Sequence, residues 1–144
     1  MKILVIGGAG YIGSHIVYGL CDSGYNVTVY DNLLTGREEN IDKRAEFING
    51  DILNIDSLKK AFSNNYSVVF HFAALKAPSE SMSRPDLYSN TNIVGTLNIL
   101  NTMLDFNVKN IVFSSSCSVY GDSQYLPIDE NHPLKPINYY GYTK

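Results

Sequence analysis

Five short apolar runs, rich in β-branched and aromatic residues, alternate along the chain with segments of helical periodicity. The runs cover residues 3–6, 26–30, 47–49, 68–72 and 110–114. Continuous apolar runs of this length are typical of strands that are buried on both faces, as in a parallel sheet. Their alternation with helices predicts an α/β fold with an open, doubly wound parallel sheet and right-handed crossovers.

Three segments between these runs place their apolar residues on one side of a helix. In the first segment these residues are Ile12, Ile16, Val17 and Leu20, and in the second they are Leu58, Ala61 and Phe62. The third segment has the longest apolar side, which consists of Ile93, Leu97, Leu100 and Leu104. We expect each of these sides to pack on the sheet. After residue 114 the pattern loosens into a loop with several prolines, and residues 138–144 predict the start of a last helix.

The composition narrows this picture to one ordinary globular domain over residues 1–144. Hydrophobic residues make up 44% and charged residues 17%, which excludes disorder, and the formal net charge of −3 argues against a nucleic-acid partner. Cys21 and Cys117 suggest no disulfide framework, and the three histidines have no metal-like spacing with them. No run reaches membrane-spanning length, and the chain opens in a strand without room for a signal peptide. We therefore expect a cytoplasmic protein without a metal or a membrane partner.

A glycine-rich segment joins the first predicted strand to the first predicted helix, and its glycines stand at Gly7, Gly10 and Gly13. Gly7 permits a tight turn, Gly10 lets the backbone approach a pyrophosphate, and Gly13 lets the helix pack closely on the strand. The amides at the start of the helix would then point at the anion. A glycine-rich turn without a ligand is the alternative. The position between strand and helix, with Asp31 at the end of the second strand, favours a Rossmann-like dinucleotide site.

Asp31 indicates which dinucleotide this site would take. A carboxylate here accepts hydrogen bonds from both ribose hydroxyls of NAD and repels the 2′-phosphate of NADP, so we expect NAD. Arg37 lies nearby in sequence and would soften that preference. Asp51 and Ile52 follow the third strand, where the adenine would lie. A strand-end cap for Asp31 and an ordinary turn for the other two are the structural alternatives.

The last helix would carry a base and a cation on one face, because Tyr140 and Lys144 are four residues apart. A free tyrosine is a poor base at neutral pH, but a nearby ammonium favours the phenolate, which can take a proton from a sugar hydroxyl. Tyr139 and Tyr142 compete for this role, and the spacing favours Tyr140. Cys117 has no paired base, so we expect it to pack rather than react.

The serine run at residues 114–116 ends the fifth predicted strand. Ligands of open α/β sheets lie beyond the carboxyl ends of the strands, so a serine hydroxyl here can hydrogen-bond a reacting oxygen. A polar strand end exposed to water is the alternative interpretation.

These motifs together resemble the extended short-chain dehydrogenase/reductase family, and finer strings resemble its UDP-glucose 4-epimerases. The strings are GGAGYIGSH at 7–15, YDNL at 30–33, HFAALK at 71–76, FSSSCSVYG at 113–121 and YGYTK at 140–144. The resemblance covers the whole chain, and the HFAALK string followed by Ser79, Glu80 and Ser81 is its most discriminating part.

The resemblance implies a role for each matching position. NAD would be held by residues along its whole length: Gly7, Gly10, Tyr11, Ile12, Gly13, Asp31, Asn32, Leu33, Leu34, Thr35, Gly36, Asp51, Ile52, Phe72, Ala73, Ala74, Leu75, Lys76, Asn92, Tyr140 and Lys144. Ser116 and Tyr140 would bind the sugar of a UDP-sugar substrate, with Tyr140 as the base and Lys144 on the nicotinamide ribose. Without the resemblance, Lys76 is a solvated charge and Asn92 a helix-surface amide.

The implied reaction interconverts UDP-glucose and UDP-galactose through a 4-keto sugar, and the family implies a homodimer. Two alternatives stay open: another NAD-dependent nucleotide-sugar enzyme (dehydratase, decarboxylase or reductase), or a non-catalytic dinucleotide-binding fragment. A dehydratase would need an acid pair beside the serine run, and Cys117 and Ser118 offer none. The family is longer than this chain, so we expect a fold truncated after the fifth strand that lacks the substrate domain. We expect this chain alone to bind NAD with little or no turnover.

Overall fold

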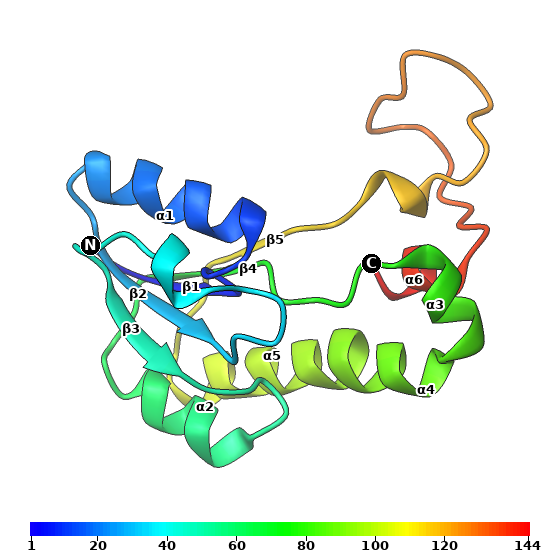
Figure 1. Cartoon of the computed structure of the whole chain (residues 1–144). Helices are drawn as coiled ribbons and strands as arrows, with labels where there is room; N and C mark the ends of the chain where they lie inside the picture. Colours follow the sequence, from blue (N-terminus) through cyan, green and yellow to red (C-terminus); the bar gives the residue numbers. More distant parts are fainter.

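The computed structural model describes all 144 residues and contains one parallel sheet of five strands (Figure 1). The strands are β1 (Lys2–Ile6), β2 (Asn26–Asp31), β3 (Glu46–Asn49), β4 (Val68–His71) and β5 (Ile111–Phe113). Their order across the sheet is β3-β2-β1-β4-β5, and every neighbouring pair is parallel. The strand order reverses direction beside β1, so a topological switch point lies between β1 and β4. The predicted doubly wound sheet is confirmed.

Burial falls from the centre of the sheet to its edges. Residues 3–6 of the central strand β1 are at most 1% exposed, whereas Val112 and Phe113 of the edge strand β5 are 45% and 38% exposed. The prediction of strands buried on both faces is therefore right for β1 and wrong for β5. An edge strand has only one neighbour, and α1 (Tyr11–Asp22) contacts β1 and β2 and lies away from β5 (Figure 1).

Helices cover the two faces of the sheet unequally. Helix α1 packs on one face, while α2 (Ile55–Phe62) and α5 (Gly95–Asp105) pack on the other (Figure 1). Alternate residues of β1 supply the two cores: Ile3 and Val5 face α1, and Leu4 and Ile6 face α2 and α5. The predicted apolar side of the second helix, Leu58, Ala61 and Phe62, is buried as expected.

The buried side of α1 agrees with the predicted one at Val17 and Leu20 and differs from it at Ile12. The structure buries Gly13, Ser14, Val17 and Cys21, while Ile12 is 56% exposed. A Cβ on Gly13 would lie 2.1 Å from the carbonyl oxygen of Gly7, so the helix touches the glycine-rich turn through its own backbone. This close approach turns the helix toward its glycine side and leaves Ile12 at the surface.

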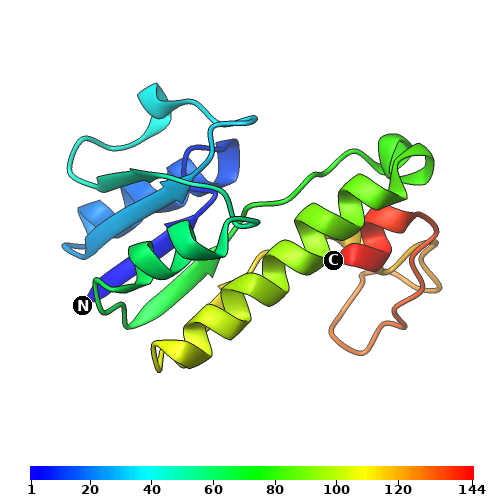
Figure 2. The same cartoon turned by 90° about the horizontal axis from the view of Figure 1, so that it is seen from below.

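A long helical rod runs along the opposite face (Figure 2). It follows the short helix α3 (Pro78–Ser83) and consists of α4 (Pro85–Tyr88), the π-helical turn η2 (Ser89–Val94) and α5. The predicted apolar stripe of this rod is wrong as a core face, because Leu97, Leu100 and Leu104 are 50%, 38% and 78% exposed. The buried side combines the apolar Ile99 and Met103 with small or polar residues: Asn92, Gly95 and Thr102.

That side can be buried because its polar groups are satisfied within the protein. The hydroxyl of Thr102 donates to the carbonyl oxygen of Asn98, 2.7 Å away. A Cβ on Gly95 would lie 2.4 Å from Cδ1 of Ile52, so this glycine lets the rod approach the loop after β3. Hydrophobicity alone could not predict such a face.

The last part of the chain lies beyond the carboxyl ends of the strands (Figures 1 and 2). It contains the 3₁₀ turn η3 (Cys117–Val119), the predicted loop, and α6 (Tyr139–Thr143). Asn138 caps α6, because its side-chain oxygen accepts a hydrogen bond from the amide of Gly141 at 2.8 Å. None of the helices has the length and apolar character needed to cross a membrane.

Candidate functional site

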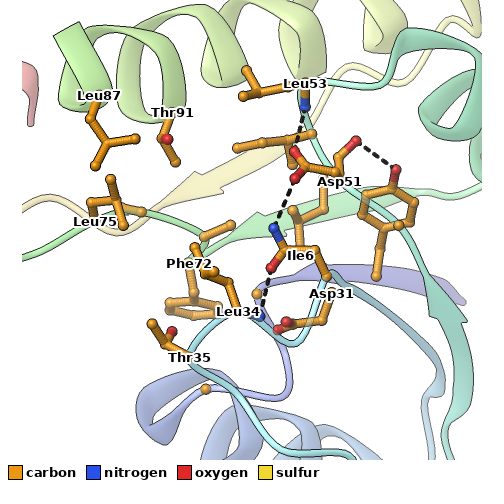
Figure 3. A pocket seen from close by; sticks show the side chains of 18 residues that line it. Ile6, Asp31, Leu34, Thr35, Asp51, Leu53, Phe72, Leu75, Leu87 and Thr91 are labelled. Carbon is orange, nitrogen blue, oxygen red and sulfur yellow. Dashed lines mark hydrogen bonds between the residues drawn. The ribbon is translucent and has the colours of Figure 1, made fainter.

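A cleft of about 270 Å³ opens at the carboxyl ends of β1, β2 and β3 (Figure 3). Twelve of its lining residues match positions predicted to hold NAD: Gly7, Gly10, Asp31, Asn32, Leu34, Thr35, Asp51, Ile52, Phe72, Ala73, Ala74 and Leu75. The structure therefore brings most of the predicted cofactor positions to one place, although they come from four separate parts of the chain.

Six further lining residues were not predicted: Ile6, Tyr30, Gly50, Leu53, Leu87 and Thr91. The first four directly precede or follow predicted positions in the sequence. Leu87 and Thr91 come from the rod and are four residues apart, so they share a helix face. This spacing is the one feature of the sequence that could have indicated them, because the sequence predicts a long helix only from Ile93 onward.

The glycine-rich turn has the geometry that a pyrophosphate needs. Gly7 adopts φ +83°, and a Cβ on it would lie 2.4 Å from the amide nitrogen of Ala73, so only glycine fits. Gly10 is the N-cap of α1, no side chain caps the helix, and its first turn contains no acidic residue. The first amides of α1, at Tyr11 and Ile12, therefore remain open to an external anion.

Asp31 ties this turn to the end of β2. One carboxylate oxygen accepts the amide of Ala9 at 2.9 Å, and the other accepts the amide of Leu33 at 2.8 Å. Leu33 itself adopts φ +59°, which turns the chain sharply after the strand. Each carboxylate oxygen has a second lone pair, so Asp31 can hold the turn and still accept from ribose hydroxyls.

A second set of hydrogen bonds closes the other end of the cleft (Figure 3). The side-chain amide of Asn32 donates to Asp51 at 2.9 Å, and the amide of Leu53 donates to the other oxygen of Asp51 at 2.8 Å. The hydroxyl of Tyr30 donates to the carbonyl of Asp51 at 2.9 Å. These bonds fix this wall of the cleft, which the apolar side chain of Ile52 also lines.

The predicted catalytic residues lie on two elements that touch. Ser116 caps η3, since its hydroxyl oxygen accepts the amide of Ser118 at 3.2 Å. A Cβ on Gly141 would lie 2.5 Å from the carbonyl oxygen of Ser118, so this glycine lets α6 pack directly against η3. The structure thereby brings the turn that carries Ser116 next to the helix that carries Tyr140 and Lys144.

The three tyrosines of α6 have different surroundings. The amide of Tyr140 donates to the hydroxyl of Ser81 at 2.9 Å, and its ring packs edge-on against Tyr88. The hydroxyl of Tyr139 is engaged elsewhere, 2.6 Å from that of Ser89, and Tyr142 is 74% exposed. These contacts support the choice of Tyr140 as the candidate base.

Lys144 is half-buried, and no carboxylate lies within 4.0 Å of its ammonium group. Its Nζ lies 4.6 Å from the centre of the Phe113 ring, a cation–π contact. Burial lowers the pKa of Lys144 from its usual value. An ammonium without a partner carboxylate keeps its field available for a neighbouring anion such as a phenolate.

Some predicted positions do not line the cleft. Asn92 is buried, and its side-chain amide donates to the carbonyl of Leu75 at 3.0 Å and to the hydroxyl of Thr143 at 2.9 Å. Because both amide hydrogens bond to protein atoms, Asn92 holds the cleft wall and α6 together rather than reaching into the cleft. Lys76 is exposed and lies outside the lining. The other predicted cofactor positions outside the lining are Tyr11, Ile12, Gly13, Leu33, Gly36, Tyr140 and Lys144.

Cys117 corrects another expectation, because it is exposed rather than packed. It stands at the first position of the surface turn η3, directly after Ser116, so its side chain meets solvent. No cluster of three or more histidine, cysteine, aspartate or glutamate side chains could hold a metal ion.

Comparison with known proteins places this geometry in a family context. Residues 3–144 match the family described as NAD dependent epimerase/dehydratase family. The chain is 46% identical over 143 residues to a putative UDP-glucose 4-epimerase of Methanocaldococcus jannaschii, covering 99% of this chain and 47% of that protein. It is also 46% identical over 145 residues to the UDP-glucose 4-epimerase of Lactobacillus helveticus, covering 100% of this chain and 44% of the other.

Solved structures give the same picture. UDP-glucose 4-epimerase from Brucella ovis in complex with NAD superposes with a TM-score of 0.95 at 40% identity, over 99% of this chain and 44% of that one. The enzyme from Bifidobacterium longum in complex with NAD+ and UDP superposes with a TM-score of 0.94 at 37% identity, over 100% and 46% of the two chains. The present chain thus spans a little under half the length of the proteins it matches.

Proposed function

The chain belongs to the NAD dependent epimerase/dehydratase family, and on that premise we propose that it is the NAD-binding part of a UDP-glucose 4-epimerase. The observation that carries the proposal is the cleft itself. Gly7 and Gly10, which precede the open amides of α1, the twice-bonded carboxylate of Asp31 and the wall at Asp51 all line it. They suit, in that order, the pyrophosphate, the ribose and the adenine of one dinucleotide.

Three residues at η3 and α6, outside the lining of the cleft, have the chemistry to move one proton. Tyr140 would take the proton of the sugar 4-hydroxyl and later return it, while Ser116 would hydrogen-bond the same oxygen. The ammonium of Lys144 would favour the phenolate form of Tyr140 and hold a ribose hydroxyl. Bound NAD would supply the hydride acceptor and donor for the sugar C4. The protein's own part is thus positioning and proton transfer.

The substrates in this proposal are UDP-glucose and UDP-galactose, which interconvert through a 4-keto sugar. Two relatives named above carry the name UDP-glucose 4-epimerase, and this supports the epimerase over a dehydratase, decarboxylase or reductase. The relatives' remaining length has no counterpart in these 144 residues, so we propose that this chain alone has little or no turnover. A cytoplasmic location and a homodimer stay parts of the proposal. The free, exposed thiol of Cys117 fits a reducing compartment.

Isothermal titration of the 144-residue chain tests the proposal in two steps. NAD should bind at one site with a saturable isotherm, and a second titration with UDP-glucose should then give little heat. Asp122→Asn, at an exposed loop position, is a matched control that should bind NAD like the wild type. Absence of saturation at millimolar NAD would overturn the proposed function. Conversion of UDP-galactose by the chain alone would overturn the expectation of an inactive chain.

A further inference from the structure

His71 is a buried ionisable side chain that the proposed chemistry does not use. It is the last residue of β4 and is 1% exposed. Its Nε2 lies 3.0 Å from the hydroxyl oxygen of Thr96, and that hydroxyl donates to the carbonyl oxygen of Asn92 at 2.6 Å. Because the single proton of the Thr96 hydroxyl goes to Asn92, the oxygen must accept from His71. The ring therefore carries its proton on Nε2, and Nδ1 is a buried acceptor without a partner.

Two routes lead from His71 to the residues of α6. The first runs through hydrogen bonds: beyond Thr96 and Asn92, the hydroxyl of Thr143 accepts from Asn92 and donates to the carbonyl of Tyr140 at 2.8 Å. The second runs through rings, because the His71 ring is 5.5 Å from that of Phe113, over which Lys144 lies.

The first route also crosses the irregular part of the rod. Asn92 and its carbonyl lie in the π-helical turn η2, and such turns are rare and occur often at functional sites. The turn points the side chain of Asn92 inward, where it bonds both the amide and the carbonyl of Leu75 in the cleft wall. When His71 donates to the hydroxyl oxygen of Thr96, the hydroxyl proton of Thr96 is directed to the carbonyl of Asn92, and this bond stabilises the π-helical turn.

We propose that His71 is a positioning residue, which in its neutral form, protonated on Nε2, holds η2, the Leu75 wall and the Tyr140–Lys144 helix in one arrangement. The value of that arrangement for catalysis rests on the proposed function, whereas the arrangement itself does not. A proton on Nδ1 would have no acceptor and would add a second positive charge near Lys144. Ile6 and Phe113 stand beside His71 in the neighbouring strands and Thr96 bonds it from α5, and none of the three is charged. Burial, and then Lys144, lower the pKa of His71 to about 4.

Four variants test this, with amide hydrogen exchange of α6 measured by NMR without NAD. Thr96→Val removes the hydroxyl that joins His71 to the carbonyl of Asn92. Thr102→Val is its matched control, because the hydroxyl of Thr102 also donates to a carbonyl four residues back but does not contact His71. His71→Phe keeps a ring and loses the donor, whereas His71→Gln keeps a donor that cannot be protonated.

Thr96→Val and His71→Phe should lower the protection of the α6 amides at least tenfold relative to those of β1. Thr102→Val and His71→Gln should leave it within twofold. Wild-type protection should fall between pH 6.5 and pH 4 after correction for intrinsic exchange, and that of His71→Gln should not. The imidazole ¹⁵N shifts of the wild type should report the form protonated on Nε2.

Equal α6 protection in Thr96→Val and Thr102→Val, or an imidazole protonated on Nδ1, would refute the positioning role. If His71→Phe fails to fold, the two threonine variants and the ¹⁵N shifts still decide. NAD titration of the same proteins separates the two proposals. A wild type with the expected exchange pattern that does not bind NAD contradicts only the proposed function.

Discussion

The carboxylate of Asp31 joins the glycine-rich turn to the loop after β2, and it also lines the cleft. It is 9% exposed and bonds the amides of Ala9 and Leu33 while lining the cleft. The side chain therefore holds the glycine-rich turn in place before any ligand arrives. The sequence predicts ribose binding or a strand-end cap for Asp31 but not its bond to Ala9, because that bond spans 22 residues and depends on how close the glycine-rich turn comes to the end of β2.

Asp31→Asn should weaken both the fold and NAD binding. An amide nitrogen in place of one carboxylate oxygen faces another donor, and a buried unsatisfied donor costs about 1–3 kcal/mol. We expect a loss of that size in urea denaturation and an affinity for NAD lower by at least tenfold in titration calorimetry. Unchanged stability would show that the bond between Ala9 and Asp31 does not hold the turn. Asp122→Asn, at an exposed position, is the control.

His71 should make the fold sensitive to mild acid. Its pKa is about 4 in the folded chain, whereas a solvent-exposed histidine has 6.5, so the unfolded chain binds more protons between these values. Stability from this residue is therefore complete above pH 6.5 and is lost as the pH falls toward 4, by on the order of 3 kcal/mol. Urea denaturation at pH 7 and pH 4 should show this loss in the wild type and a smaller one in His71→Gln. Equal losses in both proteins would contradict the assignment.

The elements of the fold show what a hydrophobic pattern can predict and what it cannot. All five strands lie within two residues of their predicted positions, because a short, continuous apolar run is buried most readily as a strand of a parallel sheet. The buried sides of α1 and α5 were mispredicted at Ile12 and at the stripe of Leu97, Leu100 and Leu104. In both helices a glycine in close contact, Gly13 or Gly95, sets the rotation of the helix.

Two glycines on α1 provide a direct test of that explanation. A Cβ on Gly13 would meet the carbonyl oxygen of Gly7 at 2.1 Å, whereas one on Gly19 would meet nothing within 4 Å. Gly13→Ala should destabilise the fold and weaken NAD binding, because backbone must move. Gly19→Ala should stabilise it by about 0.5–1 kcal/mol, since alanine is the better helix former. Thermal denaturation of both variants checks this, and a stable Gly13→Ala chain would refute the close contact.

The sequence predicts which motifs form the candidate site, but it does not predict how all the side chains around the cleft are placed. The glycine-rich turn, Asp31 and Asp51 follow strand ends, so a parallel sheet necessarily gathers them at one edge. The cleft wall from Leu87 and Thr91, and the inward amide of Asn92, depend on a π-helical turn that no local signal announces.

The molecule as a whole exposes an apolar stripe along α5, the last part of the rod. Leu97, Leu100 and Leu104 lie on the outer side of α5, while Ile99 on its inner side is fully buried. Exposed apolar surface of this kind promotes association. The stripe is thus a property of the surface and not of the core.

Replacing Leu97, Leu100 and Leu104 together with glutamine should leave the melting temperature nearly unchanged and reduce self-association. Surface substitutions of this kind usually change stability by less than about 0.5 kcal/mol each, and glutamine is a good helix former. Light scattering at increasing concentration measures the association. Ile99→Gln is the matched control and should unfold the chain, because it buries a polar amide. Unfolding of the triple variant would mean that the stripe is packed after all.

The strand order has a consequence for biosynthesis. Of the five strands, β1 leaves the ribosome before the others, yet it lies between β2 and β4. Its second neighbour ends only at His71, so at roughly 5–20 residues per second the nascent chain keeps one edge of its most apolar strand unpaired for several seconds. During translation this edge is the place where a chaperone, or a nascent chain on a nearby ribosome, has the longest access.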